Sequence, residues 1–364
     1  MSLLNDHLSF KRLSYIFKRY ERFLIPGSLL FGIMTDVLLF RSINFQTAFT
    51  VLFIHFLFAG LIIFFTRIYD NGYFRRKGFR VIRILSPLLL QYTFGALLSA
   101  CLIFYWFSSS FFASWPFILL IIVLVLSNDL LKRYYLQLKV QIGVYFFITF
   151  SLSVLILPFL VDSLGVHIFL LAGLFSLFII FLYLKGLSYF LPEISYEKRN
   201  FTYIIGAIFV VINIFYFLNI IPPVPLSLRE GEVLHFVEKE ADGYRVMVEE
   251  RSFPEVLLPG EKVQVTGGGR LYFFSAIFAP GQLETDIVHN WQYYDKGKWV
   301  DKSRIEFPIT GGRNEGYRGY SYSDGISSGK WRVSVETARG QVIGRETFRV
   351  ISSENPPELK EEKR

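Results

Sequence analysis

The stretch that decides the architecture is residues 201–226, FTYIIGAIFVVINIFYFLNIIPPVPL. Its first 21 residues carry no charge, and at about 1.5 Å per residue a helix of that length crosses roughly 30 Å of hydrocarbon. The prolines at positions 222, 223 and 225 then end the helix, because proline has no backbone N–H to donate. We therefore predict a last membrane span, Phe201–Ile221, followed by a short Pro-rich stalk at 222–229.

The composition of the chain changes at this stretch. Long runs of Leu, Ile, Phe and Val precede it, whereas charged, polar and glycine residues interrupt the apolar groups after it. The change predicts a basic cytoplasmic segment (1–22), a transmembrane domain (23–221) and an exported domain (230–352). The end of the chain, 353–364, is rich in Pro, Glu and Lys, and we expect it to be disordered.

Six more apolar stretches precede the last span, each long enough to cross a membrane as a helix. They are Phe23–Phe40, Phe45–Thr66, Ile84–Phe107, Phe111–Ser127, Ile142–Leu160 and Val166–Leu184. The sequence therefore predicts an α-helical bundle of about seven spans, of which Phe111–Ser127 is the shortest.

The basic residues indicate the orientation of these spans. Residues 1–221 carry 18 Lys and Arg, and 17 of them fall in the N-terminal segment and in every second connection. Because Lys and Arg are enriched in cytoplasmic loops, we expect a multi-pass protein of the inner (cytoplasmic) membrane. Its N-terminus would be cytoplasmic and its C-terminal domain periplasmic or extracellular. The topology accounts for the net charge of +8, so we expect the lipid bilayer and no nucleic acid as a partner.

After the stalk, apolar residues recur at every second position. Examples are Tyr244–Glu249, Ile287–Tyr294, Ile305–Ile309 and Trp331–Thr337, with glycine-containing turn signals between such segments. Short strands with this spacing predict an all-β, sandwich-like antiparallel domain of seven to nine strands. Cys101 is the only cysteine, so no intrachain disulfide can stabilise that domain.

Four segments of the exported half carry a resemblance to a known family. They are 271–282 (LYFFSAIFAPGQ), 287–291 (IVHNW), 309–321 (ITGGRNEGYRGYS) and 329–348 (GKWRVSVETARGQVIGRETF). Together they resemble the bacterial domain of unknown function 2914 over about a fifth of the chain. The resemblance implies a domain that follows a multi-span region and faces the periplasm or the exterior. It implies no activity and no catalytic residue.

Aromatic, arginine and acidic residues of these segments form a candidate ligand site. They are His289, Trp291, Arg313, Tyr317, Arg318, Tyr320, Trp331, Arg332 and Glu336. Aromatic rings stack on sugar or peptide faces and Arg binds carboxylates, which favours an envelope glycan, a cell-wall fragment or a protein partner. The alternative is that Trp291 and Trp331 are core residues and that the glycines of 311–319 only shape turns.

Two ionisable residues stand out inside the predicted spans, Asp36 and His55. Charged groups at membrane depth are costly and often functional, so they suggest an ion- or proton-linked site. The alternative is that Asp36 reaches the membrane interface and His55 is a neutral packing residue. We also expect Gln91 and Asn213 to form hydrogen bonds between helices.

Motifs for enzymatic chemistry are missing from the sequence: there is no Gly-x-Ser-x-Gly, phosphate-binding loop, His-Glu-x-x-His or cysteine pair. We therefore expect no catalytic residue, metal or cofactor. The favoured hypothesis is a non-enzymatic bacterial envelope protein whose exported domain binds a ligand. The alternatives are a transporter or membrane enzyme with the β-domain as a recognition module, and an assembly scaffold.

Overall fold

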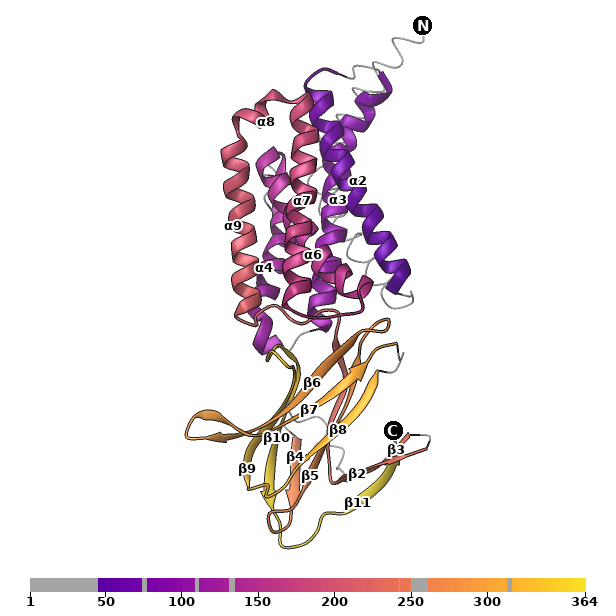
Figure 1. The fold of residues 1–364 in the computed structure, drawn as a ribbon, viewed down its shortest axis with the longest axis vertical. Coiled ribbons are helices and arrows are strands. Elements are labelled where there is room, and N and C mark those ends of the chain that lie inside the picture. The colour runs from indigo at the N-terminus through magenta and orange to yellow at the C-terminus, as the bar shows by residue number, and fades with distance from the viewer. Residues whose placement is uncertain are drawn as a thin grey trace. The chain divides into compact units, whose positions relative to one another are not determined.

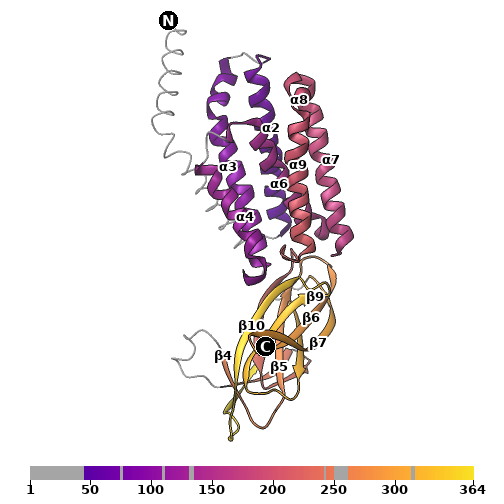
Figure 2. The ribbon, with the colours of Figure 1, turned by 90° about the vertical axis from the view of Figure 1, so that its left-hand side faces the viewer.

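The computed structural model describes residues 45–73, 77–108, 111–130, 135–241, 243–249, 261–312 and 316–364 (Figures 1 and 2). The chain divides into two compact units. The helical unit contains most of the chain before Leu218, and the β-rich unit contains Leu218–Arg364 with the short segments Tyr105–Trp115 and Pro158–Leu164.

The first part of the chain is helical, as the apolar runs predicted. The helices are α2 (Phe45–Asp70), α3 (Lys77–Phe107), α4 (Phe111–Leu130), α6 (Leu138–Leu160), α7 (Val166–Phe190), α8 (Pro192–Tyr196) and α9 (Lys198–Phe217). Helices α2, α3, α6, α7 and α9 are long and apolar enough to cross a membrane, and α4 has a shorter apolar stretch, Ala113–Asn128. These helices indicate a membrane protein. The expected first span, Phe23–Phe40, lies outside the described residues.

Helix α6 lies at the centre of the helical unit. In the most apolar 18-residue stretch of α6, 83% of the residues are buried. The corresponding stretches of α7 and α9 are only 28% and 22% buried. Aromatic side chains fill the centre: the ring of Phe150 on α6 lies 5.6 Å from the rings of both Phe169 and Phe209. The outer faces of α7 and α9 are therefore apolar and uncovered by protein in the described part of the chain.

The second part of the chain is rich in β-structure, as the period-two pattern predicted. The strands are β1 (Ser227–Leu234), β2 (Phe236–Glu240), β3 (Gly243–Glu249), β4 (Glu261–Val265), β5 (Leu271–Phe278), β6 (Glu284–Asp295), β7 (Lys298–Thr310), β8 (Tyr317–Ser323), β9 (Gly329–Thr337), β10 (Val342–Ser352) and β11 (Leu359–Lys363). They form sheets in the orders β1-β5-β8, β4-β10-β9-β6-β7 and β11-β3-β2. Strands β4 and β10 pair in parallel, whereas β6 pairs antiparallel with both β7 and β9.

One core joins the three-stranded β1-β5-β8 sheet to the five-stranded sheet. It contains Val233, Phe273, Trp291, Val333 and Phe348, which come from strands of both sheets and are almost entirely buried. Apolar burial of this kind contributes about 25 cal/mol per Å². The central strand β6 is buried from Ile287 to Gln292 without alternation, so side chains on both of its faces are covered.

Two segments expected to be irregular are folded. The Pro-rich segment is not an extended stalk: Leu226 is fully buried in the core, and β1 already begins at Ser227. The tail is not uniformly irregular either, because β11 pairs with β3. The run of charged residues at 360–363 in β11 suits an exposed edge position, and the Arg364 guanidinium lies 2.9 Å from a Glu232 carboxylate oxygen.

Candidate functional site

Three of the expected site residues lie in the interior of the β-rich unit. His289 and Trp291 are 0% exposed and Trp331 is 3% exposed. The indole of Trp291 donates to Ser321 Oγ at 3.0 Å, and that of Trp331 donates to the Ser327 carbonyl at 2.8 Å. These side chains therefore stabilise the core, which was the alternative interpretation of the two tryptophans.

The imidazole of His289 is held between two serine hydroxyls. Its Nε2 lies 2.9 Å from Ser275 Oγ, and its Nδ1 lies 2.9 Å from Ser321 Oγ. Burial lowers the pKa of His289 to about 3, so the ring is neutral at physiological pH. Because both ring nitrogens are engaged, His289 links β5, β6 and β8 rather than serving as a catalytic base.

The expected site residues on β8 lie away from those on β9. Tyr320 is 36% exposed, and its ring lies 6.1 Å from that of Tyr244. Tyr317 is partly buried against the main core, and the Arg318 carbonyl accepts a hydrogen bond from Tyr244 Oη at 3.0 Å. Arg313 lies outside the described residues.

The glycine pair before β8 has a clear packing role. Gly312 has a φ of +88°, and a Cβ there would lie 2.8 Å from the Gly281 carbonyl oxygen. A residue with a side chain would be strained in this left-handed conformation and would also collide with backbone. The need for a glycine at position 312 is therefore explained by the shape and packing of the turn.

Arg332 and Glu336 do lie together, on the side of β9 opposite the core. They belong to a set of side chains from β6, β7, β9 and β10 that we call the polar sheet face. Its members are Asn290, Gln292, Tyr294, Trp299, Asp301, Arg304, Arg332, Ser334, Glu336 and Arg345. The strand register places Gln292 beside both Asp301 and Arg332, and it places Tyr294 beside Trp299.

Hydrogen bonds fix the side chains of the polar sheet face. Arg332 Nε donates to Gln292 Oε1 at 2.5 Å, and Gln292 Nε2 donates to Asp301 Oδ1 at 2.5 Å. Asn290 Nδ2 also donates to Asp301 Oδ1, at 3.3 Å. The Asn290 Oδ1 atom is buried and accepts no hydrogen bond from the residues that the structure describes. This network holds one end of the face rigid.

An aromatic pair borders this network. The rings of Tyr294 and Trp299 lie 5.0 Å apart, and the Arg332 guanidinium carbon lies 4.2 Å from the centre of the Trp299 ring. A cation over an aromatic face gains electrostatic stabilisation. Tyr294 is 41% exposed, so this end of the face is accessible.

Burial and charge adjust the ionisable groups of the face. Desolvation, and then the like charge of Arg345, lowers the pKa of Arg332 to about 10. Desolvation also lowers the pKa of Arg345 and raises that of Glu336. Glu336 is opposed in this by Arg304, whose guanidinium lies 3.6 Å away. The face therefore presents partly desolvated groups of both signs.

Sequence reasoning missed most of the polar sheet face. Asn290, Gln292 and Tyr294 are the alternate residues of β6, and the Asp295–Gly297 turn signal predicts a hairpin. Aligning the two sides of that hairpin would have placed Trp299 next to Tyr294 and Asp301 next to Gln292. The strand register on the two sides of this turn was thus the sequence signal that could have located Trp299 and Asp301.

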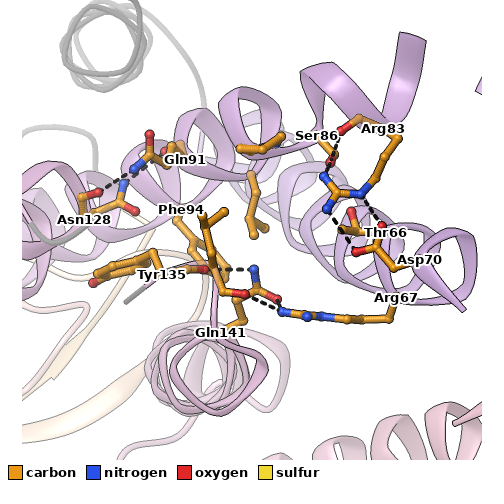
Figure 3. A pocket seen from close by; sticks show the side chains of 13 residues that line it. Thr66, Arg67, Asp70, Arg83, Ser86, Gln91, Phe94, Asn128, Tyr135 and Gln141 are labelled. Atoms are coloured by element: carbon orange, nitrogen blue, oxygen red, sulfur yellow. Dashed lines mark hydrogen bonds and ion pairs between the residues drawn. The ribbon is translucent and has the colours of Figure 1, made fainter. Parts of the chain in front are cut away.

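The helical unit contains a polar pocket of about 110 Å³ (Figure 3). Its polar lining includes Arg67, Asp70, Arg83, Gln91 and Asn128. Arg83 Nε lies 2.6 Å from Asp70 Oδ1, and Arg67 donates to Gln141 Oε1 at 3.0 Å. A cavity of this size and polarity has room for several water molecules or a small polar ligand.

Gln91 and Asn128 join α3 to α4 at this pocket. Each side-chain amide donates to the other residue's backbone carbonyl, at 2.6 and 3.1 Å. The prediction for Gln91 is thus confirmed, whereas Asn213 donates within α9, to the Phe209 carbonyl. The side-chain oxygens of Gln91 and Asn128 are buried and accept no hydrogen bond within the described residues.

The intramembrane pair suggested by the sequence stays a prediction. Asp36 lies outside the described residues. His55 Nδ1 lies 2.9 Å from the Val51 carbonyl oxygen one turn earlier, and the His55 ring lies 5.8 Å from that of Tyr92. These contacts fit a packing role for His55.

Comparisons with known proteins bear on the β-rich unit. No curated protein gives a match. One similar solved structure is the Pseudomonas fluorescens alkylpurine DNA glycosylase AlkC bound to DNA containing an abasic site analog. It is 11% identical, with a TM-score of 0.23 over 85% of this chain and 99% of that chain, and a similarity this weak carries no argument. Residues 284–350, from β6 into β10, match the family "Protein of unknown function (DUF2914)", so the C-terminal part of the chain carries a DUF2914 domain.

Proposed function

We propose that this protein binds an envelope glycan or cell-wall fragment through the polar sheet face of its DUF2914 domain. In this proposal seven spans hold the protein in the bacterial inner membrane with the N-terminus in the cytoplasm. The β-rich unit is then a sandwich domain in the periplasm or outside the cell. The placement of 17 of the 18 basic residues of 1–221 supports this orientation.

The observation that carries the proposal is the juxtaposition of an aromatic pair with a rigid polar row. Tyr294 and Trp299 offer flat apolar surface for the C–H face of a sugar ring. Gln292, Asp301 and Arg332, already joined by hydrogen bonds, offer planar donors and acceptors beside it. Their positions are fixed before binding, which reduces the entropy cost of holding a ligand.

Charge favours a glycan over a nucleic acid at this face. Residues 222–364 carry 20 Lys and Arg against 22 Asp and Glu, so the exported part lacks the basic excess that phosphate backbones require. The face mixes Arg332 and Arg345 with Asp301 and Glu336, a pattern suited to hydroxyl, amide and carboxylate groups. Cell-wall glycans with peptide stems carry all three.

The test is binding of soluble peptidoglycan fragments to the full chain in lipid nanodiscs. Trp299→Ala should weaken binding about tenfold, because one aromatic contact contributes on the order of 1 kcal/mol. Tyr322→Ala is the matched control. Tyr322 is also exposed and lies under an arginine, with Arg270 at 4.3 Å from its ring centre, but it is on β8. Equal losses in both variants, or no binding by the unaltered chain, would reject the proposal.

A second candidate function follows from the polar pocket in the helical unit. A transporter or membrane enzyme needs a polar site among its helices, and Arg67, Gln91 and Asn128 supply one. In that case Gln91→Leu would abolish uptake or turnover of a small polar substrate while glycan binding by the β-rich unit stays unchanged. Crosslinking of one stoichiometric membrane partner without glycan binding would instead favour the scaffold.

A further inference from the structure

The helical unit has a surface groove lined by residues of α7, α8 and α9. The short helix α8 joins α7 to α9 at one end of the groove (Figure 1). The groove has a volume of about 500 Å³, within the range of about 300–1,000 Å³ typical of ligand sites. Phe181 on its wall is 58% exposed, so the groove opens sideways to the surface that lipid would cover.

The lining of the groove changes from apolar to polar along its length. Leu177, Phe181 and Ile205 line the part that is distant from α8. The polar lining residues are gathered toward the α8 end: Lys185, Ser188, Ser195, Lys198 and Thr202. The groove therefore has an apolar channel and a basic, hydroxyl-rich mouth.

The length of the groove fits one leaflet of a bilayer. From Leu177 to Ser188, α7 rises by about 16 Å at 1.5 Å per residue, and half of the hydrocarbon thickness is about 15 Å. Leu177 lies near the middle of α7, and Gly206 lies near the middle of α9. An acyl chain that starts at the lysines would thus reach the membrane midplane where the groove ends.

The two ionisable side chains that line the groove within the described residues, Lys185 and Lys198, are both basic. Within the described side chains, Lys185 and Lys198 form no ion pair, while the nearby Glu197 carboxylate lies 3.1 Å from Lys139 Nζ, outside the groove lining. Basic pockets between membrane helices suit anionic lipid headgroups. A zwitterionic lipid would gain much less from the two ammonium groups.

We propose that the α7–α8–α9 groove binds one anionic phospholipid, with its phosphate between Lys185 and Lys198 and an acyl chain along the apolar wall. This inference depends on the membrane placement of the helices and is independent of the ligand of the β-rich unit. The lipid would link α7 to α9 on the side that the described part of the chain leaves uncovered.

Two glycines provide a matched test of the groove. A Cβ at Gly206, which lines the groove, or at Gly186, which does not, would meet no atom within 4 Å. Leucine at either position therefore fits the helix and raises helix propensity. Gly206→Leu fills the groove, and Gly186→Leu adds the same side chain elsewhere on the surface.

The experiment is native mass spectrometry of the delipidated full chain, titrated with phosphatidylglycerol or phosphatidylcholine of identical acyl chains. The first phosphatidylglycerol should bind about 30-fold more tightly than phosphatidylcholine, at about five- to sixfold per lysine. In Lys185→Gln/Lys198→Gln this preference should disappear, while Arg199→Gln, on an exposed side chain outside the groove lining, should keep it. Gly206→Leu should weaken the first binding of both lipids, and Gly186→Leu should not.

The same spectra contain the outcomes that overturn the proposal. If the double lysine variant keeps the preference for phosphatidylglycerol, the lysines only extend to the membrane surface, as long basic side chains do near helix ends. If Gly206→Leu and Gly186→Leu bind lipid equally, the groove is not the site. If Gly206→Leu instead converts a dimer to a monomer, the groove is an interface between two copies of the chain.

Discussion

His289 Nδ1 and Ser321 Oγ lie 2.9 Å apart in the interior of the β-rich unit. The same Ser321 oxygen accepts a hydrogen bond from Trp291, so one hydroxyl satisfies two large buried side chains. His289 and Trp291 belong to β6 in the five-stranded sheet, whereas Ser321 belongs to β8 in the three-stranded sheet. The contact is therefore a hydrogen-bonded link between the two sheets. This histidine and this tryptophan stabilise the core and do not form a surface site.

Ser321→Ala should destabilise the β-rich unit more than Ser275→Ala. The first change leaves both His289 and Trp291 with an unmade buried hydrogen bond, and the second affects His289 alone. An unsatisfied buried group costs about 1–3 kcal/mol, so we expect losses of roughly 2–4 and 1–2 kcal/mol. Thermal unfolding of the full chain in nanodiscs, monitored by tryptophan fluorescence, measures both losses of stability. Equal losses would contradict the shared role of Ser321.

The stability of the β-rich unit should fall as the pH drops from about 6.5 toward 3. The pKa of His289 is lowered from 6.5 to about 3 in the fold, so between these values the unfolded chain binds the proton that the folded chain excludes. At pH 4.5 the loss is about 3 kcal/mol. Burial raises the pKa of Glu336 and Glu346, which acts in the opposite direction. The measurement is therefore the difference in the free energy of unfolding between the unaltered chain and His289→Gln. If that difference stays constant from pH 7 to 4.5, the role of His289 in the pH dependence is contradicted.

Gly312→Ala should destabilise the β-rich unit more than Gly325→Ala. Both glycines have positive φ, at +88° and +66°, but only at Gly312 would a Cβ collide with backbone. Left-handed strain alone costs about 1–2 kcal/mol, and the collision adds to it. Urea unfolding midpoints of the two variants measure the difference. Equal midpoints would show that the backbone near Gly281 yields easily.

Gln91→Leu should destabilise the helical unit by about 1 kcal/mol, typical of a hydrogen bond between membrane helices. The control is Asn213→Leu, which removes a bond within α9 to a carbonyl one turn earlier and leaves the contacts between helices unchanged. The loss of the helical circular dichroism signal on heating in detergent measures the thermal stability of each variant. A larger effect for Asn213→Leu would contradict the importance of the α3–α4 link.

The positions of the helices could be predicted because membrane spans need long apolar runs. The apolar runs predicted the first residues of α2, α4 and α7. However, α9 starts three residues and α6 four residues before its predicted start, and α3 starts at Lys77 instead of Ile84. Its first turns carry Arg80 and Arg83, which continue the helix beyond the apolar run. A hydrophobic length therefore gives the membrane crossing and underestimates the helix.

The β-rich half was predictable in kind and less so in detail. Period two identified β6 and β9, but β11 depends on pairing with β3, more than 100 residues earlier in the chain. Alternation also could not decide which residues of β6 face outward, because residues from Ile287 to Gln292 are buried on both faces. Trp291 and Trp331 were therefore ambiguous, and Trp299 went unnoticed among charged neighbours until the register aligned it with Tyr294.

In the proposed function, the polar sheet face binds an envelope glycan. The most direct measurement is amide hydrogen exchange of the full chain in nanodiscs with and without saturating soluble peptidoglycan fragments. If the polar sheet face binds the glycan, exchange should become slower across the β6–β7 hairpin at 292–301 and in the facing part of β9 at 330–336, with β8 at 317–323 unchanged. Protection confined to β8, or no protection anywhere in the β-rich unit, would contradict it.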